Sequence, residues 1–316
     1  MSLDQISNFD TDPLLGGLIV SVGISNPLEP SKWSYGADQV NEVVLEIART
    51  LISHGAAVCF GHDWRADGVM LALYEMAEAH DAVLAHEDAR KNPLIHNFRY
   101  HGSANPLEEW RERQIRGVLN LVDTSAPNLP DGALGTYQRA VSLSVMRREM
   151  TEESTARIAF GGRDMIEGNL QSAPWGRTPG VLEEILLSLA LKKPLYLSRL
   201  FGGVTEYAID RLEGIPRQIN FQLNGDLAKC YQDPVTHVEE LRDPASDLRP
   251  LDLESIWDNF HRAAGRLGSE SNAVIKRLCE SNRLSLEENQ RLFNASTSAE
   301  ALNWILIGLR RLKAGR

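Results

Sequence analysis

Residues 156–194 read ARIAFGGRDMIEGNLQSAPWGRTPGVLEEILLSLALKKP and decide the fold. The apolar run that ends at Phe160 predicts a buried strand, the pair Gly161–Gly162 ends it, and TPGVLEE opens a helix after a loop. We expect Thr178 to cap that helix, with Pro179 in its first turn. Such a junction directs main-chain N–H groups and the positive end of a helix at one spot. It therefore predicts a bound phosphate or similar anion.

Two arginines flank the same loop. Arg163 follows the glycine pair and Arg177 precedes the helix, and a guanidinium is a fork-shaped donor that suits phosphate. The plainer interpretation is a turn that only joins a strand to a helix. The coincidence of glycines, arginines and a helix start favours a ligand site. The helix itself shows one apolar face, made of Leu182, Ile185, Leu186 and Leu189.

The same strand, loop and helix unit recurs toward the N-terminus. Residues 17–22 and 56–60 read as buried strands, and each is followed by a polar, turn-rich loop and a segment with helical periodicity. Further strands are expected near 94–99, 117–122 and 195–197. Strands that alternate with helices predict an α/β fold with a doubly wound, mostly parallel, Rossmann-like sheet. Its ligand crevice is expected at the carboxyl ends of the strands.

The C-terminal third changes character. After about residue 224 a charged passage punctuated by prolines leads into helical patterns, so we expect a nucleotide-binding domain over 1–224 and a helical extension over 225–316. Ser285 and Glu288 have capping-box spacing. An apolar stripe is expected to dock on the main domain or on a second subunit; it consists of Leu302, Ile305, Leu306 and Leu309.

Composition excludes several classes of function. The chain has 316 residues, 43% of them hydrophobic, and a formal charge of -10, which argues against a broad grip on nucleic acid or an anionic membrane. Its three cysteines show no paired spacing, and His62 with Asp63 lacks a third ligand, so neither a disulfide framework nor a metal is expected. The start, MSLDQISNFD, lacks the pattern of an export signal. We expect a soluble, cytoplasmic protein with no cofactor.

Read together, the segments resemble the SLOG superfamily of Rossmann-like proteins over roughly Leu18 to Gly203. SVGISNP resembles the small-residue loop after the first strand of LOG phosphoribohydrolases, and FGHDWRADGVMLAL resembles their second glycine-rich turn. The order of SVMRREMTEESTARIAFGG and TPGVLEE resembles the arginine-bearing helix, strand and PGGxGTxxE motif of those enzymes. Here an insertion from Arg163 to Pro179 separates the two ends of the motif, which implies a pocket reshaped for another ligand.

The resemblance implies two functions. The first is a sensor domain that binds an ADP-ribose-like or nicotinamide-related nucleotide, in a stress or antiphage pathway. The alternative is a LOG-like N-glycoside hydrolase acting on a nucleoside monophosphate, in which Glu183 and Arg147 or Arg148 would be the catalytic residues. A third interpretation is an interaction module with a vestigial pocket. The resemblance also implies a homodimer.

The candidate ligand-binding residues gather in four segments. They are Gly23, Ser25 and Asn26; Gly61, His62 and Arg65; Gly161, Gly162, Arg163, Arg177, Thr178, Gly180, Val181 and Glu183; and Gly202 with Gly203. The predicted partner is a small-molecule nucleotide.

Overall fold

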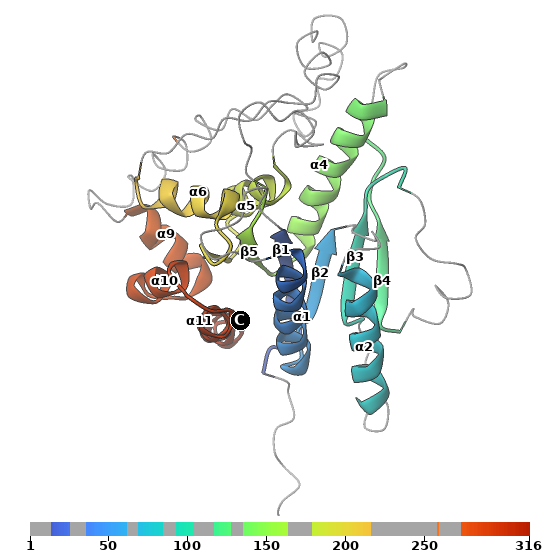
Figure 1. Cartoon of the computed structure of the whole chain (residues 1–316), viewed down its shortest axis with the longest axis horizontal. Coiled ribbons are helices and arrows are strands. Elements are labelled where there is room, and N and C mark those ends of the chain that lie inside the picture. The colour runs from blue at the N-terminus through green and yellow to red at the C-terminus, as the bar shows by residue number, and fades with distance from the viewer. Residues whose placement is uncertain are drawn as a thin grey trace, which may run out of the picture.

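The structure is a computed structural model that describes residues 14–25, 36–61, 69–84, 93–103, 117–127, 135–163, 179–215, 258 and 273–316. These residues build a six-stranded, all-parallel sheet with strand order β4-β3-β2-β1-β5-β6 (Figure 1). The strands are β1 (Ile19–Ser25), β2 (Ala57–Gly61), β3 (Ile95–Arg99), β4 (Leu119–Asp123), β5 (Ala156–Gly161) and β6 (Leu195–Ser198). The predicted doubly wound α/β fold is confirmed. Strand β1 runs three residues further than the predicted 17–22, so Gly23 and Ser25 belong to the strand.

Helices cover both faces of the sheet. On one face, α1 (Ala37–Ser53), α2 (Met70–Leu84) and α11 (Ser298–Ala314) pack on side chains such as Val20, Val58 and Ile158. On the other face lie α4 (Gly135–Glu153), α5 (Gly180–Ala190) and α6 (Gly203–Leu212). In this second layer α5 and α6 pack on Ala159, Leu195 and Leu197, while Met146 and Met150 of α4 pack on Cys59 and Phe98.

The C-terminal helices complete the core. These are α9 (Ala273–Asn282), α10 (Leu286–Phe293) and α11. The predicted capping box at the start of α10 is present: Ser285 Oγ accepts from Glu288 N at 3.1 Å, and Ser285 N donates to Glu288 Oε2 at 2.7 Å. Of the apolar stripe, Leu302, Ile305 and Leu309 are buried and Leu306 packs against them. The stripe therefore docks on the sheet of its own chain.

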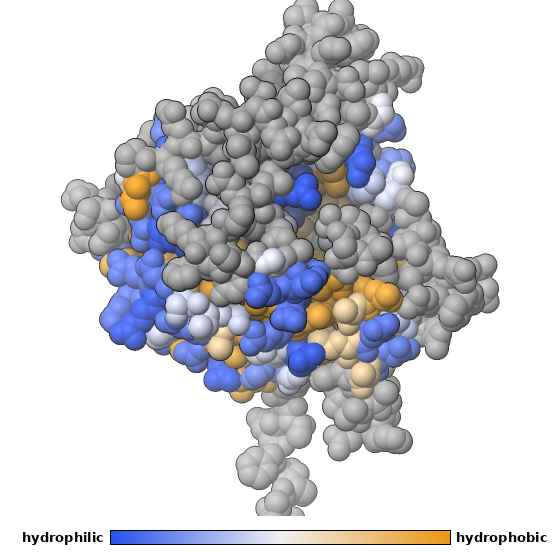
Figure 2. All heavy atoms as spheres, in the orientation of Figure 1, coloured by the Kyte–Doolittle hydropathy of each residue, from blue (hydrophilic) through white to orange (hydrophobic). Residues whose placement is uncertain are grey.

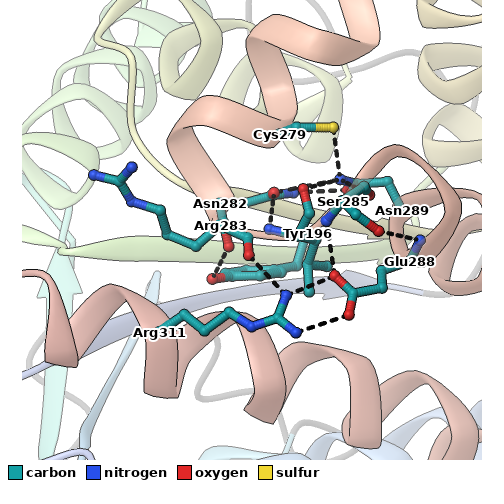
Figure 3. Close-up of polar contacts among 9 residues, drawn as sticks. Tyr196, Cys279, Asn282, Arg283, Ser285, Glu288, Asn289 and Arg311 are labelled. Atoms are coloured by element: carbon teal, nitrogen blue, oxygen red, sulfur yellow. Dashed lines mark hydrogen bonds and ion pairs between the residues drawn. The ribbon is translucent and has the colours of Figure 1, made fainter.

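A buried polar network fixes these helices to β6 (Figure 3). Asn282 Nδ2 donates to Leu195 O at 2.9 Å and to Asn289 Oδ1 at 2.7 Å, and Tyr196 Oη donates to Asn282 O at 2.9 Å. On α11, a Cβ added to Gly308 would come within 2.5 Å of Tyr196 Cε1. The close approach of α11 thus requires glycine. The predicted domain boundary near 224 lies outside the described residues and stays a prediction.

The outer surface is mixed in character. Figure 2 shows hydrophilic side chains over much of the face that carries α1, and apolar side chains where α2 lies; Leu71 of α2 is 45% exposed. In the described part of the chain, none of the helices has the length and apolar character needed to cross a membrane.

Candidate functional site

The strand order places the topological switch point of the sheet between β1 and β5. The chain leaves β1 through α1 toward β2, whereas β5 continues through α5 toward β6, so the connections diverge at the carboxyl ends of these two neighbours. Ligands of open α/β sheets bind at such a switch point. The two strands end in register, with Ser25 beside Gly161.

A pair of glycines occupies this switch point. Gly161 and Gly162 have φ values of 64° and 90°, and Gly162 N donates to Ser25 O at 2.8 Å. A Cβ added to Gly162 would lie 2.9 Å from Cβ of Val181 and 2.5 Å from Cγ2 of Val204. Absence of a side chain here lets the end of β5 pack against Val181 of α5 and Val204 of α6. The predicted close approach of a ligand to this main chain stays a prediction.

The start of α6 touches the same pair. Gly202 and Gly203 have φ values of 65° and 63°, and Val204 N donates to Gly162 O at 3.3 Å. A Cβ on Gly203 would collide with the carbonyl oxygen of Gly162. The structure therefore brings together two glycine pairs, at 161–162 and 202–203, that lie far apart in the sequence.

The start of α5 differs from the prediction. Pro179, not Thr178, stands at the N-cap position with φ -50° and ψ 133°, and Gly180 is the first helical residue. The predicted Thr178 cap is wrong, because the extended ψ at Pro179 delays the helix by one residue. The first intrahelical bond runs from Glu183 N to Pro179 O at 3.0 Å.

Both helix starts lack a side-chain cap. Pro179 has no side-chain acceptor and neither does Gly202, the N-cap of α6. The first-turn N–H groups of a helix have no intrahelical partner, and the helix dipole adds partial positive charge there. Two such ends lie beside Gly161 and Gly162, and Gly162 O accepts from one first-turn N–H of α6, that of Val204. The remaining first-turn N–H groups suit an anion. We call this group of residues the rim; it consists of Ser25, Gly161, Gly162, Gly180, Val181, Gly202 and Gly203, of which Ser25, Gly180 and Gly202 are partly exposed.

Side chains of the second helical layer fill the space beside two other predicted glycines. A Cβ on Gly61 would lie 3.1 Å from Met146 Cε, and a Cβ on Gly23 would collide with Oε2 of Glu184. Packing by α4 and α5 therefore explains why glycine stands at both positions. A ligand contact by either glycine stays a prediction.

The structure pairs Glu183 with one of the two predicted arginines. Arg147 Nη1 donates to Glu183 Oε2 at 2.6 Å, and the Glu183 side chain is fully buried while that of Arg147 is 12% exposed. The same guanidinium lies over the start of α5, because a Cβ on Gly180 would be 2.8 Å from Arg147 Nη2. Arg148 is half-buried one position further along α4, so it points about 100° around the helix from Arg147.

Arg163 follows the glycine pair and is exposed. Five other predicted residues lie outside the described residues: Asn26, His62, Arg65, Arg177 and Thr178. Their ligand contacts stay predictions.

A second ion pair, formed by Arg157, was not predicted from the sequence. The sequence pattern predicts Arg157 only as part of an apolar strand. Arg157 is completely buried, and its Nη1 donates to Glu184 Oε2 at 2.6 Å. The only sequence signal was one arginine in a buried strand, combined with Glu184 and Ser188 one helical turn apart in the facing helix.

Other titratable groups on this face belong to the core. His96 and Cys59 pair across β3 and β2. Burial lowers the pKa of His96, against the opposing charge of Glu153, and burial raises the pKa of the Cys59 thiol. Neither group is therefore charged near neutral pH. Within the described ranges, no group of three or more His, Cys, Asp or Glu residues could hold a metal ion.

Comparison with protein families identifies the family of this chain. The model of the family described as SLOG cluster2 matches residues 14–292, which is most of the chain. The protein belongs to the SLOG cluster2 family. The predicted membership of the SLOG superfamily is confirmed, and it implies a nucleotide-derived ligand in general terms.

Comparison with individual proteins adds little to this family assignment. One similar solved structure is titled the X-ray structure of TM1055, a structural genomics target. It shares 16% sequence identity with a TM-score of 0.36, covering 60% of this chain and 79% of that one. No curated protein matches the sequence.

Proposed function

We propose that this SLOG protein binds an ADP-ribose-like or nicotinamide-related nucleotide at the rim, as a sensor that does not turn its ligand over. The observation that carries the proposal is the meeting of two uncapped helix starts, α5 and α6, beside Gly161 and Gly162 at the switch point of the sheet. Main-chain N–H groups and helix dipoles directed at one spot favour a phosphate. A chain with a net charge of -10 must hold an anion by such local means.

The carboxylates of α5 support binding over catalysis. Glu183 and Glu184 each lie 2.6 Å from a guanidinium nitrogen, on Arg147 and Arg157 respectively. Each ion pair engages Oε2 of its carboxylate and holds the side chain inside the protein, where it anchors the first turns of α5. We infer that the start of α5 holds the ligand in place and stabilises its negative charge, and that it does not supply a reacting group.

One observation favours the alternative function. The pair Arg147 and Glu183 lies at the first turn of α5, next to the rim, and an N-glycoside hydrolase needs an acidic group near the bond that breaks. The second candidate is therefore a LOG-like phosphoribohydrolase that acts on a nucleoside monophosphate, with Glu183 and Arg147 in the catalytic roles.

A ligand panel distinguishes the two functions. Thermal unfolding is measured with ADP-ribose, NAD, AMP and inorganic phosphate, because a ligand that binds only the folded protein raises its melting temperature. At a concentration about a hundred times Kd the stabilisation is about 2.7 kcal/mol, which corresponds to several degrees. The same mixtures are then separated for products. Free base that disappears in Glu183→Gln supports the hydrolase, a shift without products supports the sensor, and no shift contradicts both.

Arg163 offers a test of the anion site itself. Arg163→Ala removes an exposed guanidinium next to the glycine pair, and we expect affinity for the best nucleotide to fall about ten- to a hundredfold, as for a lost charge-assisted contact. Arg310→Ala is the matched control, because it also removes an exposed arginine, in this case from α11. Equal affinities in the two variants would place the anion elsewhere.

The pathway and the assembly remain part of the proposal. A role in a stress or antiphage response and a homodimer follow from the resemblance to other SLOG proteins. Sedimentation of the purified chain tests the dimer.

A further inference from the structure

Arg157 stands where physical chemistry disfavours a charge. Strand β5 lies inside an all-parallel sheet and every residue of it is buried, so an uninterrupted apolar run is expected. The side chain of Arg157 is the largest fully buried one in the described chain. Taking a guanidinium out of water is costly unless it is paired and hydrogen-bonded.

The guanidinium joins three elements. Its Nη1 donates to Glu184 Oε2 on α5 at 2.6 Å, its Nε donates to Ser188 Oγ one turn further along α5 at 3.0 Å, and its Nη2 donates to Thr151 Oγ1 on α4 at 2.8 Å. The partners are themselves anchored, because Ser188 Oγ donates to Glu184 O at 2.8 Å and Thr151 Oγ1 donates to Arg147 O at 2.6 Å. One strand residue thus connects β5 to both helices of the second layer.

These contacts lead to the rim. The Glu184 carboxylate that Arg157 holds lies directly against Gly23, two residues before the end of β1. Glu184 belongs to the first turns of α5, whose start at Gly180 and Val181 forms part of the rim. Thr151 is one turn from Arg147, whose guanidinium lies over Gly180. Arg157 is therefore connected to the rim through Glu184 and through Thr151, without being part of it.

Stability does not explain such a pair. Well-packed apolar residues in place of a buried ion pair are often as stable or more stable, so the pair is weak evidence for a stabilising role. A charge that breaks the pattern of a strand is expected where function requires a defined geometry. The proximity of Glu184 to Gly23 identifies that geometry as the position of α5 on β1.

We propose that Arg157 is a positioning residue: by holding Glu184 against Gly23 it fixes the first turn of α5 at the carboxyl end of β1, and thereby sets the affinity of the rim for its ligand. The inference rests on the proposed nucleotide-binding function. It adds a residue that contacts no ligand but determines how tightly one is bound.

A double-mutant cycle tests this inference. Kd for ADP-ribose is measured by calorimetry for the wild type, Arg157→Met, Glu184→Gln and the combination of the two. If Arg157 acts through Glu184, each single substitution weakens binding about tenfold, and the combination weakens it by the same tenfold rather than a hundredfold. Tyr196→Phe is the control, because it removes a remote buried hydrogen bond and should lower the melting temperature without changing Kd.

The outcomes separate the two proposals. Unchanged Kd in Arg157→Met, or independent losses that multiply, would overturn the positioning role while nucleotide binding stands. Failure of the wild type to bind any nucleotide would overturn the proposed function together with this inference. Should Arg157→Met not fold because Glu184 is left unpaired, Glu184→Gln and the combination still decide: equal tenfold losses support the inference, and a further loss in the combination refutes it.

Discussion

Gly162→Ala is the substitution whose cost can be worked out most fully from the structure. The new Cβ would lie 2.5 Å from Cγ2 of Val204 and 2.9 Å from Cβ of Val181, closer than such atoms approach in folded proteins. Overpacking of this kind costs about 1–3 kcal/mol. A non-glycine residue at positive φ costs about 1–2 kcal/mol more, and φ is 90° here. We expect a total loss of about 2–5 kcal/mol in the free energy of unfolding.

A second glycine separates the two contributions. Gly17 has φ 77°, and no atom lies within 4 Å of a Cβ added there, so Gly17→Ala carries the backbone cost without the clash. Equilibrium unfolding in urea gives the free energy of unfolding of both variants. Replacing glycine by alanine also stabilises a protein by making its unfolded chain less flexible, and this contribution is the same in both variants and cancels. We expect Gly162→Ala to be about 1–3 kcal/mol less stable than Gly17→Ala. Equal stabilities would refute the close contact of β5, α5 and α6 at the rim.

Three further predictions concern the C-terminal helices. Hydrogen bonds from Arg311 lower the pKa of Glu288 to about 2. A carboxylate whose pKa is lowered in the folded state stabilises the protein above its ordinary pKa, and this stability is lost as pH falls from about 4.5 to about 2. In urea unfolding across this range, the free energy of unfolding should therefore fall less in Glu288→Gln than in the exposed control Glu287→Gln, by less than about 1 kcal/mol. Asn289→Ala should cost about 1–3 kcal/mol by urea unfolding, because Asn282 loses its buried partner; a cost within about 0.5 kcal/mol of zero would contradict the network. Gly308→Ala should cost about 1–3 kcal/mol, since its Cβ meets Tyr196, and a melting temperature equal to that of the wild type would show that α11 does not approach β6 so closely.

Local patterns predicted most of the fold. Apolar runs bounded by glycine or polar loops predict the strands, including those near 94–99 and 117–122, which are β3 and β4 in the structure. The crevice expected at the carboxyl ends of the strands predicts that the glycine pairs at 161–162 and 202–203 lie near the start of the TPGVLEE helix, because loops after parallel strands share one edge of a sheet. The structure places these segments together. That helix starts one residue later than predicted, because the extended ψ of Pro179 places this residue at the N-cap position.

Long-range pairs were not visible in the sequence. The partner of Arg157 is 27 residues away on a different element, and only the packing of α5 against β5 selects Glu184 over its neighbour Glu183. The polar network of Asn282 and Asn289 depends in the same way on how α9 and α10 meet β6. Periodicity describes which face of an element is buried, but not which polar groups become partners inside it.

The central claim is that the rim beside Gly161 and Gly162 holds the phosphates of a nucleotide. The most direct measurement is a crystal structure of the protein with the nucleotide that stabilises it most. We expect phosphate density within hydrogen-bonding distance of first-turn N–H groups of α5 or α6, next to the end of β5. A nucleotide bound with its phosphates on another surface would contradict the account.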